Sequence, residues 1–159
     1  MERRYRRSMS FGETQKFMRA ALDCARDAAS RGAVPVGAVI VKDGAIICQA
    51  SNNPHAAYDP TGHAEINAIR MAADILQTDR LIGCDLWVTL EPCAMCAGAI
   101  AHARIRRLYY AASDPKGGAI ENGPRLFSHS TIHHKPEIYS GMCEDDAAQL
   151  LQQFFQQRR

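Results

Sequence analysis

Long apolar stretches are absent from this sequence, and no run approaches the roughly 18 consecutive apolar residues that a membrane-spanning helix needs. The first seven residues are rich in arginine, but no apolar segment follows them, so the sequence does not predict a secretory signal. Internal repeats and low-complexity segments are absent as well. The sequence therefore predicts neither a repeat protein nor a membrane protein, and we expect no membrane partner.

A disulfide framework is not indicated either. The 6 cysteines are unevenly spaced in a chain with many helix signals. Such spacing is typical of a protein from a reducing compartment, so we expect a cytoplasmic protein with free thiols. Cys24, Cys48, Cys84 and Cys143 are expected to be buried as small apolar side chains.

The composition fits one globular domain. The chain has 159 residues, of which 47% are hydrophobic and 23% charged, which is ordinary for a soluble domain with a sizeable core. We expect a flexible basic tail over residues 1–12 and a single domain over 13–159. The net charge of +2 says little about partners, although the arginine clusters near both ends of the chain suit contact with phosphate.

Residue periodicity predicts alternating helices and strands. Helices are expected over residues 13–30, 63–76, 93–103 and 145–157, with a short helix near 125–128. Strands are expected over residues 34–41, 45–50, 85–90, 107–112 and 137–140. Asp43-Gly44, between the first two strands, is a hairpin signal, so these strands should be antiparallel neighbours. This order predicts an α/β fold in which helices cover a mixed five-stranded sheet.

Residues 89–98, Thr-Leu-Glu-Pro-Cys-Ala-Met-Cys-Ala-Gly, place two cysteines between a predicted strand and a predicted helix. Pro92 suits the first helical turn, where a missing N–H costs no hydrogen bond. Cys93 and Cys96 are three residues apart, so their sulfur atoms can lie on one face of the helix. A helix N-terminus also favours the thiolate, which is the form that binds metal. The pair therefore predicts a site where both sulfurs bind one ion.

Two cysteines do not complete a zinc site, because a catalytic site usually has three protein ligands and an open position for water. His63 opens the helix expected over 63–76 and offers a third ligand, and Glu65 follows in the same turn. The pattern His-x-Glu followed by Pro-Cys-x-x-Cys is similar to the signature of zinc-dependent nucleobase deaminases. That resemblance implies one zinc ion per subunit held by His63, Cys93 and Cys96, with Glu65 as the catalytic acid and base.

Four other interpretations of these residues stay open. A redox pair would not need the His-x-Glu motif, and a structural four-ligand zinc site would need a second ligand pair, which the sequence lacks at suitable spacing. A zinc-stabilised RNA-binding protein without turnover would be expected to lose Glu65, which is present. The main alternative is a deaminase of the same fold that acts on guanine, another free base or a nucleotide.

Four segments resemble the bacterial tRNA-specific adenosine deaminase family. They are residues 34–38 (Val-Pro-Val-Gly-Ala), 59–65 (Asp-Pro-Thr-Gly-His-Ala-Glu), 88–98 and 112–118 (Ala-Ser-Asp-Pro-Lys-Gly-Gly). The resemblance covers nearly the whole chain from Phe17 onward. It implies a homodimer with a three-layer α/β/α, cytidine-deaminase-like fold. It also implies the conversion of adenosine to inosine at the wobble position of an arginine tRNA, so that the anticodon stem-loop of tRNA would be the partner.

The same resemblance implies a set of substrate-binding residues, namely Asn52, Val34, Asp114, Lys116, Phe154, Phe155 and Arg158. Asn52 would hydrogen-bond the purine, Val34 would line its pocket, and the loop around Asp114 would touch the RNA backbone. The residue types alone also allow a turn role for Asn52, a loop cap for Asp114 and core packing for one phenylalanine. Gly62 and Ala33 depart from the family pattern, so the resemblance does not fix the shape of the pocket.

Overall fold

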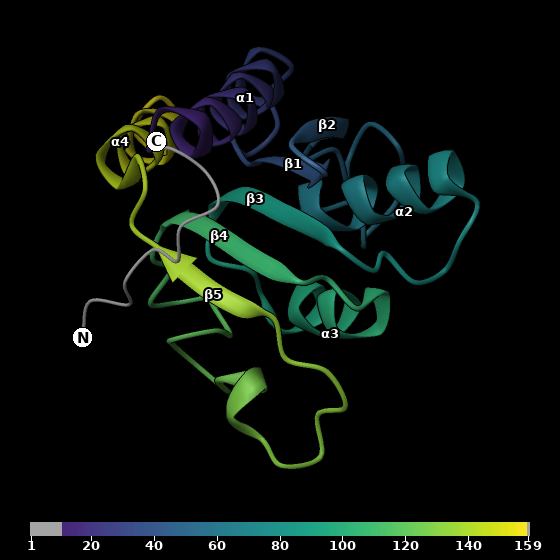
Figure 1. The fold of residues 1–159 in the computed structure, drawn as a ribbon. Coiled ribbons are helices and arrows are strands. Elements are labelled where there is room, and N and C mark those ends of the chain that lie inside the picture. The colour runs from purple at the N-terminus through teal and green to yellow at the C-terminus, as the bar shows by residue number, and fades with distance from the viewer. Residues whose placement is uncertain (1–10, 159) are drawn as a thin grey trace.

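The computed structural model of the chain describes residues 11–158 (Figure 1). In chain order the elements are α1 (Phe11–Ser30), β1 (Gly37–Lys42), β2 (Ala45–Ser51), α2 (Ala64–Leu76), β3 (Cys84–Leu90), α3 (Ala94–Ala103), β4 (Arg107–Ala112), the 3₁₀ helix η1 (Leu126–Ser128), β5 (Glu137–Ser140) and α4 (Glu144–Gln156). The α1 helix begins at Phe11, slightly earlier than the sequence predicts. The rest of the expected tail, residues 1–10, lies outside the described residues, as does Arg159.

The first strand begins later than expected. The sequence predicts a strand from residue 34, but β1 starts at Gly37. The preceding residues form a tight turn, in which the N–H of Val36 donates to the carbonyl of Val34 at 2.8 Å. Pro35 has no N–H to donate to a sheet, which is a physical reason for the strand to start after it. The turn leaves the side chains of Val34 and Val36 at the end of the sheet.

The five strands form one mixed sheet in the order β2-β1-β3-β4-β5. The β1 strand pairs antiparallel with both β2 and β3, whereas β4 pairs parallel with β3 and β5. The hairpin predicted between β1 and β2 is confirmed, and Asp43 and Gly44 adopt the positive φ angles of 51° and 76° that a tight two-residue hairpin turn requires.

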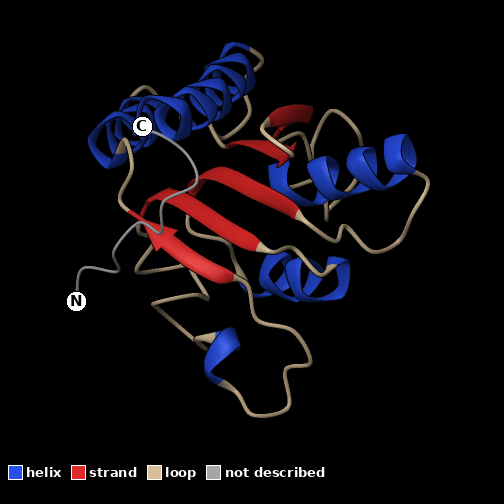
Figure 2. Cartoon of the chain, viewed as in Figure 1, coloured by secondary structure: helices blue, strands red, loops and turns tan. Residues whose placement is uncertain are grey.

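Helices cover both faces of the sheet, as Figure 2 shows. The α1 and α4 helices pack on one face, over side chains that include Val39 and Trp87. The α2 and α3 helices pack on the other face, over Ile40 and Leu86. Adjacent residues of one strand thus face opposite layers, which is the period-two pattern of a doubly covered sheet. The predicted α/β/α arrangement is confirmed, and no helix within residues 11–158 is long and apolar enough to cross a membrane.

Gly37 allows β1 to pack directly against the backbone of α1. A Cβ atom at this position would lie 1.9 Å from the carbonyl oxygen of Ala21 and 2.7 Å from the backbone nitrogen of Ala25. Because both atoms belong to helix backbone, Gly37→Ala is expected to destabilise the protein by about 2–3 kcal/mol and to lower Tm by roughly 5–10 °C. Thermal unfolding followed by circular dichroism measures this loss. Gly98→Ala is the matched control because a Cβ there meets no atom within 4 Å, and an equal fall in Tm for both variants would contradict the explanation.

Candidate metal centre and catalytic site

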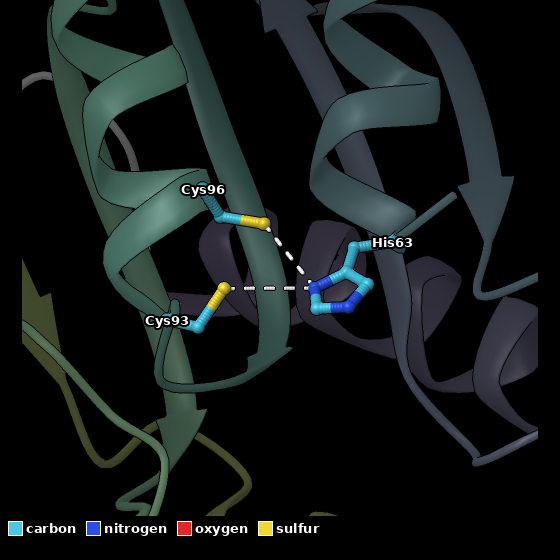
Figure 3. A group of neighbouring side chains, drawn as sticks. All are labelled: His63, Cys93 and Cys96. Carbon is cyan, nitrogen blue, oxygen red and sulfur yellow. Dashed lines mark hydrogen bonds between the residues drawn. The ribbon is translucent and has the colours of Figure 1, made fainter. Parts of the chain in front are cut away.

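Two helix N-termini carry the predicted ligands. His63 and Cys93 are the N-cap residues of α2 and α3, both with extended backbone, and neither side chain forms a capping hydrogen bond. Both side chains instead point into the space between the two helices, where Cys96 from the first turn of α3 joins them (Figure 3). The sequence predicts that the helices include residues 63 and 93, whereas the structure starts them one residue later. Pro92 therefore precedes the cap and lies outside the first turn.

The position of His63 depends on Asn67, one turn further along α2. The side-chain amide of Asn67 donates to the carbonyl of Ser51 at 3.0 Å and to that of Gly62 at 3.3 Å. These hydrogen bonds join the end of β2, the residue before His63 and the helix itself. The two ends of the loop between β2 and α2 are thus held together by Asn67. These hydrogen bonds fix the backbone that carries the His63 imidazole.

The three candidate ligand atoms form one compact group. The Nδ1 atom of His63 lies 3.6 Å from the Sγ of Cys93 and 3.5 Å from the Sγ of Cys96, and all three atoms lie within 4.8 Å of one another. Zinc binds thiolate at about 2.3 Å and imidazole at about 2.0–2.1 Å, so tetrahedral ligands of this kind are about 3.6 Å apart. The spacing and the donor set therefore fit one zinc ion.

The two thiols of this group differ from the other cysteines. A hydrogen bond from Cys96, together with the nearby imidazole of His63, lowers the pKa of Cys93 to about 5. The same hydrogen bond and burial raise the pKa of Cys96, because its thiol donates to the Cys93 thiolate. The pair thus holds one proton in a place where a cation could replace it. Burial raises the pKa of the remaining four thiols, which are free. Cys48 and Cys84 are buried as expected, whereas the prediction was wrong for Cys24 and Cys143, which are only partly buried.

Glu65 lies in the first turn of α2, and its side chain belongs to the same site without joining the ligand group. Its exposed fraction is 4%, and this burial raises the pKa of its carboxyl group. The carboxyl is close enough to Cys96 to hydrogen-bond with the thiol. A carboxyl group beside a metal-ligand set is placed to accept and then donate a proton.

A cavity of about 270 Å³ opens directly beside these residues. Its lining includes His63, Glu65 and Cys93, as well as three of the substrate-binding residues that the sequence predicts, Val34, Asn52 and Asp114. Residues that sequence reasoning did not select also line it, namely Val36, Leu90, Glu91 and Gly117. Glu91 is the one charged residue among these four. Its position directly before Pro92-Cys93 is the sequence feature that could have identified it as a cavity residue.

The other predicted substrate residues do not line the cavity. Lys116 lies in the loop that follows β4, where its N–H donates to the Asp114 carboxylate at 3.2 Å. Asp114 thus caps this loop, the alternative role that the sequence left open, and it lines the cavity as well. On α4, Phe154 is buried and Phe155 is 51% exposed, as expected for one inward-facing phenylalanine. The Arg158 guanidinium lies over the Phe154 ring, 4.1 Å from its centroid.

Comparison with known proteins assigns the class of this fold and site. Residues 12–112 match the family model of the cytidine and deoxycytidylate deaminase zinc-binding region. This span contains all three candidate ligands, Glu65 and the first four strands of the sheet. The fold and the site therefore define a zinc-binding deaminase domain.

Individual relatives narrow this class. The chain is 54% identical to a tRNA-specific adenosine deaminase of Agrobacterium fabrum over 92% of this chain and 97% of the relative. A solved structure from studies of A-to-I editing by tRNA:A34 deaminases is 55% identical, with a TM-score of 0.85 over 86% of this chain and 99% of that one. Guanine deaminase from Bacillus subtilis is 43% identical over 66% of each chain, with a TM-score of 0.62. The chain belongs to the tRNA-specific adenosine deaminase family.

Proposed function

We propose that this protein removes the amino group of adenosine at the wobble position of a tRNA anticodon by hydrolysis, which yields inosine and ammonia. One observation carries the proposal. His63, Cys93 and Glu65 line the same cavity as Asn52 and Val34. The candidate metal ligands and the candidate proton carrier therefore lie beside a space that can hold a nucleobase. The membership of the tRNA-specific adenosine deaminase family supports adenosine within tRNA as the substrate.

In the proposed mechanism Glu65 carries out the proton transfers. His63, Cys93 and Cys96 would hold the zinc ion, which when bound would act as a Lewis acid and lower the pKa of a water molecule. Glu65 accepts a proton from the attacking water and delivers it to N1 of the purine, and a second transfer through the same carboxylate protonates the amino group that leaves C6. The burial of Glu65 keeps bulk water from competing for these protons. Water and adenosine thus become inosine and ammonia with no net change in the enzyme.

The remaining residues would bind the RNA. Asn52 is buried at the cavity wall, where its side-chain amide can donate to and accept from the edge of a purine. Val34 provides an apolar surface for the ring. Asp114 and Lys116 belong to a loop that would meet the anticodon backbone. Phe155 and Arg158 would contact the RNA further from the cavity, with Arg158 as a cation that suits phosphate. Phe154 is buried, so the RNA contact expected for it from the sequence is replaced by packing beneath the Arg158 guanidinium.

The proposal extends to the organisation of the protein. We propose a homodimer in which each subunit, folded as a single domain over residues 13–159, binds one zinc ion. An arginine tRNA is the proposed substrate, and the cytoplasm is the proposed location because tRNA modification takes place inside the cell. The free thiols of all 6 cysteines support a reducing compartment.

The decisive experiment offers three substrates to the zinc-loaded protein and measures ammonia with identification of the product. The substrates are an arginine-tRNA anticodon stem-loop, free guanine and free cytidine. We expect inosine from the stem-loop alone, and a stem-loop with guanosine at the wobble position serves as the control that should release no ammonia. Turnover of guanine or cytidine in place of the stem-loop would contradict tRNA as the substrate.

A further inference from the structure

Glu91 is a buried carboxylate that the proposed chemistry does not use. It follows β3 directly, its exposed fraction is 2%, and it lines the substrate cavity. A buried carboxylate is costly unless hydrogen-bond donors surround it. The donors that surround Glu91 all come from one segment, the loop of residues 113–122 that follows β4.

The two oxygens of Glu91 bind the two ends of this loop. Oε1 accepts from the N–H of Asp114 at 3.1 Å, from the hydroxyl of Ser113 at 3.4 Å and from the side-chain amide of Asn122 at 2.6 Å. Oε2 accepts from three successive N–H groups, those of residues 120, 121 and 122, at 3.0–3.1 Å. Successive N–H groups that converge on one point form an anion-binding concavity. In this protein the concavity encloses the chain's own carboxylate.

The loop also approaches Glu91 at Gly118. A Cβ atom on Gly118 would lie 2.4 Å from Oε2 of Glu91, so the packing leaves no space for a side chain at this position. Between the two held ends, Asp114 and Gly117 line the cavity. Glu91 therefore connects the strand that precedes Cys93 and Cys96 with a loop that lines the cavity.

We propose that Glu91 is a positioning residue that holds residues 113–122 in the conformation that binds the RNA substrate. The part of this inference that names RNA rests on the proposed function, whereas the ordering of the loop by Glu91 does not. A loop held in its binding conformation loses less conformational entropy when substrate binds, so release of the loop should weaken substrate binding more than it slows the chemical step.

Glu91→Gln tests this role because it preserves the size of the side chain but turns an acceptor into a donor that faces other donors. Hydrogen exchange followed by mass spectrometry should show at least about tenfold faster exchange over residues 114–122, with the exchange of β3 and α3 unchanged. KM for the anticodon stem-loop should rise about tenfold while kcat changes by less than about threefold. Zinc content and Tm should stay close to those of the unmodified protein.

Three further variants sharpen the test. Gly118→Ala should reproduce the effects of Glu91→Gln, because it pushes the loop away from the same carboxylate. Asp79→Asn is the control, since it removes an exposed carboxylate from the turn between α2 and β3, outside residues 113–122, and its loop exchange and KM should not change. Glu91→Ala removes the carboxylate and should also raise KM. Added formate or acetate should lower this KM, because a small carboxylate can enter the vacated concavity. The same additives should have no effect on the KM of Gly118→Ala.

Several outcomes would overturn the inference. Unchanged loop exchange and KM in Glu91→Gln would show that the carboxylate does not hold the loop. Loss of zinc with a large fall in Tm would assign Glu91 to the stability of the whole domain instead. If the unmodified protein fails to deaminate the stem-loop, the proposed function fails, while the exchange measurement still decides whether Glu91 orders residues 113–122.

Discussion

Glu65→Gln is expected to abolish turnover while the protein stays folded and loaded with zinc. The proposed mechanism uses this carboxylate for each proton transfer, and glutamine can neither accept nor return a proton. We expect the single-turnover rate on the anticodon stem-loop to fall by about 10³-fold or more, at the upper end of the range for a general acid–base group. Glutamine matches glutamate in size and carries no charge, so the buried position 65 should tolerate it without loss of stability.

The measurement combines rapid-quench kinetics with zinc analysis and thermal unfolding. Asp74→Asn is the matched control, because it removes an exposed carboxylate from the same helix, α2, and should leave the rate unchanged. A Glu65→Gln protein that keeps more than about a tenth of the normal rate would refute the acid–base assignment. A variant that lost its zinc would mean that Glu65 supports the metal site and would refute its role as a separate proton carrier.

His63→Ala is expected to remove both the metal and much of the stability. Only Cys93 and Cys96 would remain as ligands, and two thiolates hold zinc far more weakly than a complete set of three. A ligand that binds only the folded protein stabilises it by about 4 kcal/mol at a thousand times its Kd, and this contribution would be lost. The purified variant should contain less than about a tenth of the normal zinc and should unfold at a lower temperature.

A chelator separates the loss of metal from other effects of this substitution. Treatment with a strong zinc chelator should lower the Tm of the unmodified protein toward that of His63→Ala and should not change the variant further. His102→Ala is the control, because this exposed histidine lies at the other end of α3 and packs against His133. Normal zinc content in His63→Ala would refute the ligand role.

The sequence was sufficient for those features that depend on local periodicity or on residue type. Strand alternation separates Ile40 from Val39 and assigns them to opposite helix layers, and the structure confirms this three-layer fold. The predicted starts of α2 and α3 were one residue too early. Sequence periodicity alone does not distinguish an N-cap residue from the first residue of the helix. The predicted start of β1, at residue 34, was three residues too early. Apolar content alone does not distinguish the turn at Val34–Val36 from a strand.

Glu91 shows what local patterns do not contain. Its partners lie 22 to 31 residues further along the chain, in a loop without periodicity. Backbone N–H groups are identical for every residue except proline, so no residue type in the loop identified them as donors. The same reasoning applies to Asn67, whose contacts with Ser51 and Gly62 depend on how a turn closes. Such contacts become visible only when the chain is folded.

The order of the strands also has a kinetic consequence. The candidate histidine and cysteine ligands come from segments that follow β2 and β3, and both of these strands pair with β1, which lies between them in the sheet. We therefore expect a complete metal-binding group only after both pairings have formed, which would place zinc binding late in folding. Zinc should accordingly stabilise the native state without stabilising the transition state for folding. Zinc binding should then slow the unfolding rate and prolong the lifetime of the folded chain, while the rate at which the chain folds stays nearly the same.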